Sequence, residues 1–345
     1  MISRIIEQSS VAQIQAHIDE NERFVIVSHV GPDGDAIGSA LAMRHFLKTL
    51  NKQPVVVVPN AYPSFLKWMP AADEILVYEN NKELADKQLA KADVIFIMDL
   101  NERRRMNILA NAVVDDAPAP KIMIDHHPQP DTFAKIIVSH PEIASTGELV
   151  FRLLWQMGKL SDINIACAEC IYTGMMTDTG GFSYNSNSAD IYHIVSMLIS
   201  IGIDKDDIYR KVYNNYSENR IRLTGYATYR KMKLYPEYHT ALIWLTRREL
   251  EQFNYVSGDA EGLVNLPMSI EGVIFSVFMR EESDKIRLSF RSQGSFPCNQ
   301  YAQKVFRGGG HLNASGGESY SGIKKTILKF ENSLPKYAEL LKQSI

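Results

Sequence analysis

The first half of the chain alternates short apolar runs with stretches of helical periodicity, and this alternation constrains the fold most. Apolar runs typical of buried strands cover residues 24–27, 54–58, 75–77, 94–98 and 121–124. After the first run, Ala40, Met43, Leu47 and Leu50 recur at the spacing of a helix. Apolar strands that alternate with helices indicate a parallel sheet with helices on both faces. We therefore expect an α/β fold.

The second half of the chain predicts a separate, smaller domain. At 345 residues, the chain exceeds the size at which a single hydrophobic core grows efficiently, so two domains are expected. Residues 188–233 have a helical pattern rich in charge and tyrosine, which is typical of a helical linker. Strand-like runs then cover 240–245, 272–279 and 286–290, and a glycine-rich segment precedes a terminal helix from about residue 323. We predict domains at 1–187 and 234–345, joined by a helical linker at 188–233.

Composition excludes several classes of protein. The formal net charge of −3 provides no global basic field for long nucleic acid. Three cysteines do not make a disulfide framework, which fits a reducing compartment, and Cys167 and Cys170 have the surroundings of a buried helix. No segment has the apolar length of a membrane span or a signal peptide. We expect a cytoplasmic protein without membrane contact.

Carboxylates and imidazoles follow the ends of several predicted strands. In an open parallel sheet, ligands bind outside the carboxyl ends of the strands. Four segments supply residues at such places: His29, Asp33 and Asp35 after the first strand, Asp99 after the fourth, Asp125, His126 and His127 after the fifth, and Asp178 just past a helical stretch. A single aspartate of this kind is more often a helix cap, but four segments directed toward one edge favour a functional site.

These residue types suit a pair of divalent metal ions. Carboxylates gathered at one edge repel one another unless cations neutralise them. Mixed histidine and aspartate ligands without a thiolate suit Mn²⁺ or another octahedral ion better than a structural zinc. Two metals about 3.5–4 Å apart can share a carboxylate and lower the pKa of a bridging water to make a hydroxide nucleophile. The sequence therefore predicts a two-metal phosphoester hydrolase.

The motifs resemble those of the DHH phosphoesterase superfamily, which includes RecJ-type exonucleases, family II inorganic pyrophosphatases, cyclic dinucleotide phosphodiesterases and NrnA-type oligoribonucleases. The matching motifs are His29-x-x-x-Asp33-x-Asp35, Asp99, Asp125-His126-His127 and Asp178. Residues 289–292 and 308–317 resemble the DHH-associated domain, so the resemblance covers nearly the whole chain. It implies a DHH catalytic domain at 1–187 and a DHH-associated substrate-binding domain at 234–345. One departure is Gly181, where NrnA-type members often carry arginine.

The resemblance also implies a role for each site residue. His29, Asp33 and Asp99 would hold one Mn²⁺, while Asp35, Asp99, His126 and Asp178 would hold the second, with Asp99 bridging. Asp125 would orient a neighbouring side chain, and His127 would act on the scissile phosphate as a hydrogen-bond donor or general acid. The residues implied to bind substrate are Arg291, Ser292, Gly308, Gly309, Gly310 and His311. Glycines let the backbone approach a phosphate closely, and Arg291 could grip one bidentately.

The layout of one DHH domain, a helical linker and one associated domain is similar to the NrnA type. RecJ-like enzymes usually carry further DNA-binding domains, and family II pyrophosphatases lack the GGGH loop. The resemblance implies an exonuclease that degrades RNA of a few nucleotides (nanoRNA) to nucleoside monophosphates. Removal of the 3′-phosphate from adenosine 3′,5′-bisphosphate would be a related activity. The implied partners are short RNA or small nucleotides rather than long nucleic acid or a membrane, and a homodimer is possible.

Two alternatives stay open at this point. A phosphodiesterase for cyclic or linear signalling dinucleotides would share the same motifs. A nucleotide-binding sensor without catalysis is disfavoured, because a pure binder has no need of the full set of metal ligands.

Overall fold

The computed structural model describes residues 2–344, which form two compact units divided between Asn215 and Tyr216. The predicted domain ends at residues 1 and 345 lie outside the described residues. The segment expected to be a linker is helical and is shared by the units. Helices α6 (Ala189–Ile201) and α7 (Lys205–Tyr213) pack against α5 (Ile165–Asp178) in the first unit. Helix α8 (Glu218–Arg230) packs against β8 (Thr240–Leu245) in the second unit. The three-part division at 187 and 233 stays a prediction.

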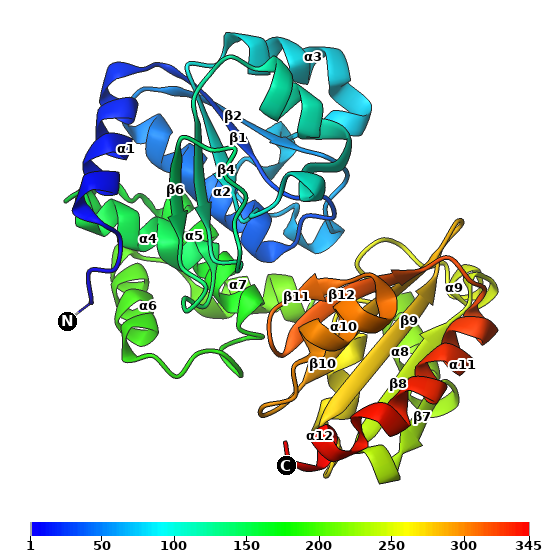
Figure 1. Ribbon diagram of the computed structural model, residues 1–345. Coiled ribbons are helices and arrows are strands. Elements are labelled where there is room, and N and C mark those ends of the chain that lie inside the picture. Colours follow the sequence, from blue (N-terminus) through cyan, green and yellow to red (C-terminus); the bar gives the residue numbers. More distant parts are fainter. Residues whose placement is uncertain (1, 345) are drawn as a thin grey trace. The chain divides into compact units, whose positions relative to one another are not determined.

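Unit 1, residues up to Asn215, contains a six-stranded parallel sheet in the order β3-β2-β1-β4-β5-β6. Its strands are β1 (Arg23–Val27), β2 (Gln53–Val58), β3 (Leu76–Val77), β4 (Val94–Met98), β5 (Lys121–Asp125) and β6 (Ile136–Ser139). Its other α-helices are α1 (Gln8–Glu20), α2 (Gly34–Thr49), α3 (Tyr78–Lys91) and α4 (Thr146–Gln156), as labelled in Figure 1. The α/β fold class expected from the sequence is confirmed.

Side chains of the central strands alternate between two apolar cores. Phe24 and Ile26 of β1 join Phe96 of β4 in the core beneath α1, α2, α4 and α5. Their neighbours Val25 and Ile97 join the core on the opposite face, beneath α3 and the short helices η3 (Arg103–Leu109) and η4 (Ala112–Asp116). Because both faces of these strands are covered, their sequences are continuously apolar rather than alternating. Cys167 and Cys170 are buried in α5, as expected for core residues.

Helices α2 and α5 approach each other unusually closely. A Cβ atom at Gly38 would lie 2.7 Å from the carbonyl oxygen of Cys170. A Cβ atom at Gly174 would lie 2.6 Å from a carboxylate oxygen of Asp35. Gly38 therefore allows the two helices to pack closely, and Gly174 leaves room for the carboxylate of Asp35.

Unit 2, residues from Tyr216, contains a second six-stranded sheet in the order β11-β12-β10-β9-β8-β7. Strands β8 and β9 pair in parallel and the other neighbours pair antiparallel. The remaining elements are β7 (Met232–Tyr235), β9 (Phe275–Glu281), β10 (Ile286–Ser292), β11 (Gly309–Gly310), β12 (Ala314–Ser319), α9 (Arg247–Gln252), α10 (Cys298–Phe306), α11 (Ile323–Ser333) and α12 (Ala338–Lys342). A core rich in aromatic rings, including Phe275, Phe290 and Tyr301, lies beneath α10 and α11. Within residues 2–344, no helix combines the length and apolarity that a membrane crossing requires.

Candidate active site

The site lies where three adjacent strands of unit 1 end. Strands β1, β4 and β5 are neighbours in the sheet and run parallel, so their carboxyl ends meet at one edge. His29, Asp99 and His126 come one or two residues after these strands end. The fourth predicted segment reaches the same edge through Asp178, which is the last residue of α5 rather than a residue beyond it. All eight residues predicted in unit 1 therefore belong to one cluster.

One part of the cluster consists of His29, Asp33 and Asp99, whose ligand atoms lie within 4.8 Å of one another. The Nε2 atom of His29 is 3.3 Å from Asp99 and 3.9 Å from Asp33. The Nδ1 atom lies 3.0 Å from the carbonyl oxygen of Val30. Because a carbonyl can only accept, Nδ1 carries the proton and Nε2 presents a lone pair. This buried Nε2 has no hydrogen-bond partner within residues 2–344, as expected for an atom reserved for a metal ion.

The other part of the cluster surrounds His126. Its Nε2 atom is 3.3 Å from Asp178, 3.5 Å from Asp99 and 3.9 Å from Asp35. Its Nδ1 atom lies 3.1 Å from the carbonyl oxygen of Ile143, which fixes the same tautomer as in His29. Asp99 contributes to both parts, so its carboxylate is shared between the two groups of ligand atoms.

The amino end of α4 holds two of the carboxylates in place. The backbone N–H groups of Thr146 and Gly147 donate to Asp35 over 2.6 and 2.8 Å. The Thr146 hydroxyl donates to Asp99 over 2.9 Å. Asp99 itself has φ of 55°, in the left-handed region that aspartate adopts more readily than most residues. The sequence showed residues 145–148 only as a helix start, so it gave no indication that Thr146 contacts the site.

The clustered carboxylates repel one another, so bound cations would stabilise their charged forms. Burial, followed by the charges of Asp99 and Asp178, raises the pKa of Asp35 well above its ordinary value. Burial lowers the pKa of His126, but the carboxylates, Asp178 foremost, outweigh burial and raise it to about 9. A proton on His126 thus neutralises part of the negative charge. Divalent ions would neutralise more of it and would displace that proton, so the donor set fits a metal pair.

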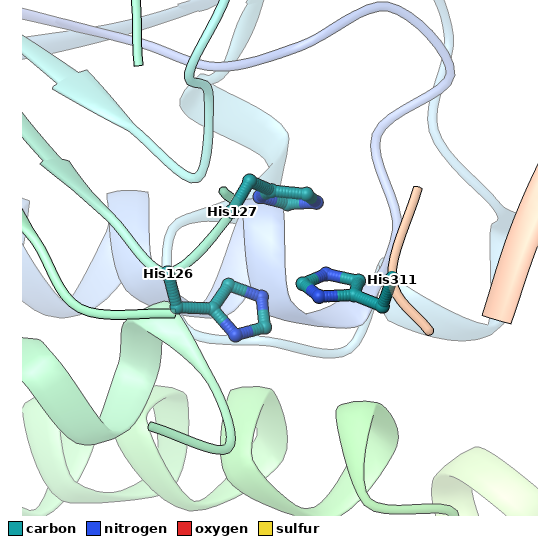
Figure 2. Close-up of side chains that lie close together, drawn as sticks. All are labelled: His126, His127 and His311. Atoms are coloured by element: carbon teal, nitrogen blue, oxygen red, sulfur yellow. The ribbon is translucent and has the colours of Figure 1, made fainter. Parts of the chain in front are cut away.

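His127 is held by Asp125 at the end of β5. The Asp125 carboxylate accepts from the backbone N–H of His127 over 2.8 Å, and its other oxygen lies 2.8 Å from the ring Nδ1. Figure 2 shows the rings of His126 and His127 projecting from this segment, and their centroids are 4.8 Å apart. Burial, followed by the charge of Asp99, raises the pKa of Asp125 to about 7. Asp125 therefore orients the ring of His127 through these two interactions.

In unit 2, the predicted substrate-binding residues lie on β10 and on or beside β11, the two strands that flank β12. Arg291 of β10 pairs with Ala314 of β12, and Ala314 accepts a backbone hydrogen bond from His311. Ser292 is linked to Asn313 by a backbone and a side-chain hydrogen bond. The guanidinium of Arg291 donates to the carbonyl of Phe290, while its buried Nε finds no hydrogen-bond partner in the described part of the chain. These residues form one local surface within unit 2.

The backbone conformation and close packing at positions 308 and 310 require glycine. A Cβ atom at Gly308 would lie 1.9 Å from the carbonyl oxygen of Gly316, and Gly310 has φ of 138°. Gly309 has no atom near its missing Cβ and is exposed. The segment can thus present bare backbone to a ligand, as expected for contact with a phosphate or ribose.

Comparison with known proteins identifies the family. Residues 23–175 match the DHH family N-terminal domain, and residues 240–344 match the DHHA1 domain. An exopolyphosphatase-related protein of known structure from Bacteroides fragilis is 53% identical, with a TM-score of 0.94 over 99% of this chain and 100% of that one. The chain belongs to the DHH phosphoesterase superfamily. It is accordingly a hydrolase-type enzyme with the DHH and DHHA1 domains in the expected order.

Two activities occur among the names of the curated relatives of this DHH protein. The bifunctional oligoribonuclease and PAP phosphatase NrnA of Bacillus subtilis is 28% identical over 87% of this chain and 90% of its own length. The cyclic-di-AMP phosphodiesterase GdpP of the same species is 26% identical over 93% of this chain, but the match covers 49% of GdpP. The sequence similarity alone therefore separates the two activities poorly.

The departure at Gly181 has a structural counterpart in this DHH protein. Gly181 has φ of 70°, and a Cβ atom there would lie 3.4 Å from the ring of Tyr209. The rings of Tyr209 and Tyr213 lie in tilted contact beside the loop that follows Asp178, with ring centroids 4.9 Å apart and an interplanar angle of 49°. Tyrosine rings here lie next to the position at which NrnA-type members often carry arginine.

Proposed function

We propose that the chain hydrolyses short RNA oligonucleotides to nucleoside monophosphates, and adenosine 3′,5′-bisphosphate to AMP, with two divalent metal ions. The observation that carries the proposal is the shared position of Asp99 between two sets of buried ligand atoms. Similarity to NrnA over nearly the whole length of both chains supports the substrate class. The net charge of −3 agrees with a short substrate, because binding of long nucleic acid relies on many phosphate contacts.

In this proposal, His29, Asp33 and Asp99 hold one metal ion, and Asp35, Asp99, His126 and Asp178 hold the other. Mn²⁺ is the ion we expect, given its preference for mixed imidazole and carboxylate ligands. The bound metals would supply charge neutralisation and an activated water. Other residues of the chain would orient the groups that contact the metals and the substrate. Thr146 holds Asp99 in place, and Asp125 holds His127 in place.

His127 would face the scissile phosphate and donate a hydrogen bond or a proton to the leaving oxygen. Its Nδ1 atom is engaged by Asp125, so Nε2 is the atom that would act. In unit 2, Arg291, Ser292, Gly308, Gly309, Gly310 and His311 would bind the rest of the substrate through the guanidinium and exposed backbone N–H groups.

A second candidate is a phosphodiesterase for cyclic or linear signalling dinucleotides. The similarity to GdpP over 93% of this chain supports this candidate, because its 26% identity is close to the 28% identity to NrnA. A homodimer also stays a prediction.

A side-by-side assay tests the proposal. Purified protein with Mn²⁺ would be offered a linear RNA dinucleotide, a cyclic dinucleotide, adenosine 3′,5′-bisphosphate, pyrophosphate and a short polyphosphate. We expect mononucleotides from the linear dimer and slow or no cyclic turnover. Preferential opening of the cyclic compound would favour the second candidate, and turnover of polyphosphate alone would refute both. The Asp99→Asn variant, purified identically, controls for contaminating nucleases.

A further inference from the structure

Three consecutive arginines follow the proposed bridging ligand, and two of them are paired on the surface. Arg103 forms an ion pair with Asp115, and Arg104 forms one with Glu102. Both guanidinium groups thus have carboxylate partners in a solvated region. Such pairs contribute little to stability and need no ligand.

Arg105 differs from its two neighbours. It is half-buried, as Arg103 is, but no carboxylate of residues 2–344 lies within ion-pair distance of its side chain. Its single side-chain hydrogen bond goes to the Oδ1 atom of Asn101, over 3.3 Å. A guanidinium has five N–H donors, so most of them are left for another acceptor. A cation partly removed from water without an anionic partner is unfavourable, and an anionic ligand would offset that cost.

Asn101 places this cation beside His127. Asn101 is buried, and its Nδ2 atom donates over 2.8 Å to the carbonyl of Pro128, the residue after His127. The backbone carbonyl of Arg105 accepts from Val30, the residue after His29, over 2.7 Å. Arg105 is therefore tied to the loops that carry His29 and His127.

We propose that Arg105 is a substrate-binding residue that contacts a non-bridging oxygen of the phosphate group beside His127. The ligand class is a phosphate monoester or diester anion, which a planar guanidinium can bind through two parallel N–H groups. The inference rests on the proposed function, because the proposed function places the scissile phosphate beside His127. It adds a residue that the sequence motifs did not include.

Three variants test it: Arg105→Ala, Arg105→Lys and the matched surface control Arg104→Ala. For each Mn²⁺-loaded protein, AMP affinity would be measured by calorimetry, and kcat and KM with a linear RNA dinucleotide. Mn²⁺ affinity and Tm would be measured in parallel. Loss of a charged phosphate contact should weaken AMP binding by about tenfold or more in Arg105→Ala, with Arg105→Lys intermediate. Arg104→Ala should stay within about twofold of wild type.

The inference is overturned if Arg105→Ala binds AMP and turns over the dinucleotide as the wild type does. It is also overturned if the variant loses Mn²⁺ affinity or Tm in proportion to activity, because the role is then structural. Bis(p-nitrophenyl) phosphate separates this inference from the proposed function. If the wild type cleaves this generic diester but not RNA, the proposed function fails. The same variants then decide the role of Arg105 on the generic ester.

Discussion

Unit 1 contains two buried groups of charged side chains that are built in opposite ways. In the first, Arg152 is 2% exposed and donates to Glu148 and Asp190, and to the backbone of Ser3. In the second, the carboxylates of Asp99 and Asp178 face the imidazoles of His29 and His126, with nitrogen–oxygen distances of 3.3–3.5 Å. In the first group, Arg152 provides a counter-charge shared by two carboxylates and links three segments. The second leaves negative charge for a ligand to neutralise.

One carboxylate of each group, Asp190 in the first and Asp35 in the second, has a pKa shifted in the opposite direction. Hydrogen bonds from Ser3 and Arg152 lower the pKa of Asp190 to about 2, so its charge is stabilised by the fold. Burial and like charges raise the pKa of Asp35, so its charge is opposed by the fold. A fold maintains an unfavourable group of this kind where function requires it.

Asp99→Asn tests the uncompensated group and should have the largest effect. Asparagine tolerates the left-handed backbone at this position and still accepts from Thr146, so the metal-free protein should keep its Tm. Loss of the proposed bridging ligand should lower kcat by about a thousandfold or more. The rise in Tm on addition of Mn²⁺ should also disappear, as measured by calorimetry. Retained activity would refute the assignment of the metal ligands.

Arg152→Met tests the compensated group. Removal of one partner leaves buried carboxylates without a counter-charge, which should cost about 3–5 kcal/mol in the free energy of unfolding. Urea denaturation measures the effect. The matched control is Arg247→Ala, which breaks an exposed ion pair with Glu251 and should cost less than about 1 kcal/mol. Equal costs for the two variants would show that the buried group does not stabilise unit 1.

Thr146→Val tests how the helix α4 positions the site. Valine keeps the shape and the backbone N–H bond to Asp35 but loses the hydroxyl that holds Asp99. Loss of a group that orients a metal ligand should lower Mn²⁺ affinity by about 10–100-fold. Thr146→Ser should restore most of that affinity. Thr173→Val is the control, because the Thr173 hydroxyl bonds only to a carbonyl of its own helix. A similar loss in both valine variants would indicate a general packing effect.

The sequence predicted the unit 1 sheet well because its strands are buried on both faces and are continuously apolar. It missed β6 at the sheet edge, and it missed β12, whose sequence Ala-Ser-Gly-Gly-Glu-Ser lacks the branched and aromatic residues typical of strands. One of the two glycines that conceal β12 as a strand, Gly317, is required by packing, because a Cβ atom there would lie 3.0 Å from Phe306. Tertiary packing, which local pattern does not reveal, decides such elements.

The proposed metal ligands could be predicted because His29, Asp99 and His126 closely follow strand ends, and because the motif that resembles the DHH superfamily supplies Asp33, Asp35 and Asp178. Thr146 and Arg105 could not, because each acts through a contact that only the fold creates. Thr146 is 47 residues from Asp99 in the chain, and Arg105 depends on Asn101 to reach the loop of His127. The signal for Arg105 was weak: it is the third of three arginines, and nothing in the sequence shows which two are paired on the surface.

Asp190→Asn gives the smallest effect and tests the compensated group by its pH dependence. The pKa of Asp190 falls from its ordinary 3.8 to about 2 on folding, so the charged form contributes stability at pH values above the ordinary pKa. That contribution should be about 1–2 kcal/mol at pH 7 and should be lost as pH falls from about 4 toward 2. Urea titrations of wild type and variant between pH 7 and pH 3 measure the difference. Asp206→Asn, an exposed surface change, should give almost no difference at any pH. A difference in free energy of unfolding between wild type and Asp190→Asn that instead stays constant down to pH 3 would contradict this expectation. That result would show that packing and neutral hydrogen bonds, and not the charge of Asp190, account for its contribution to stability.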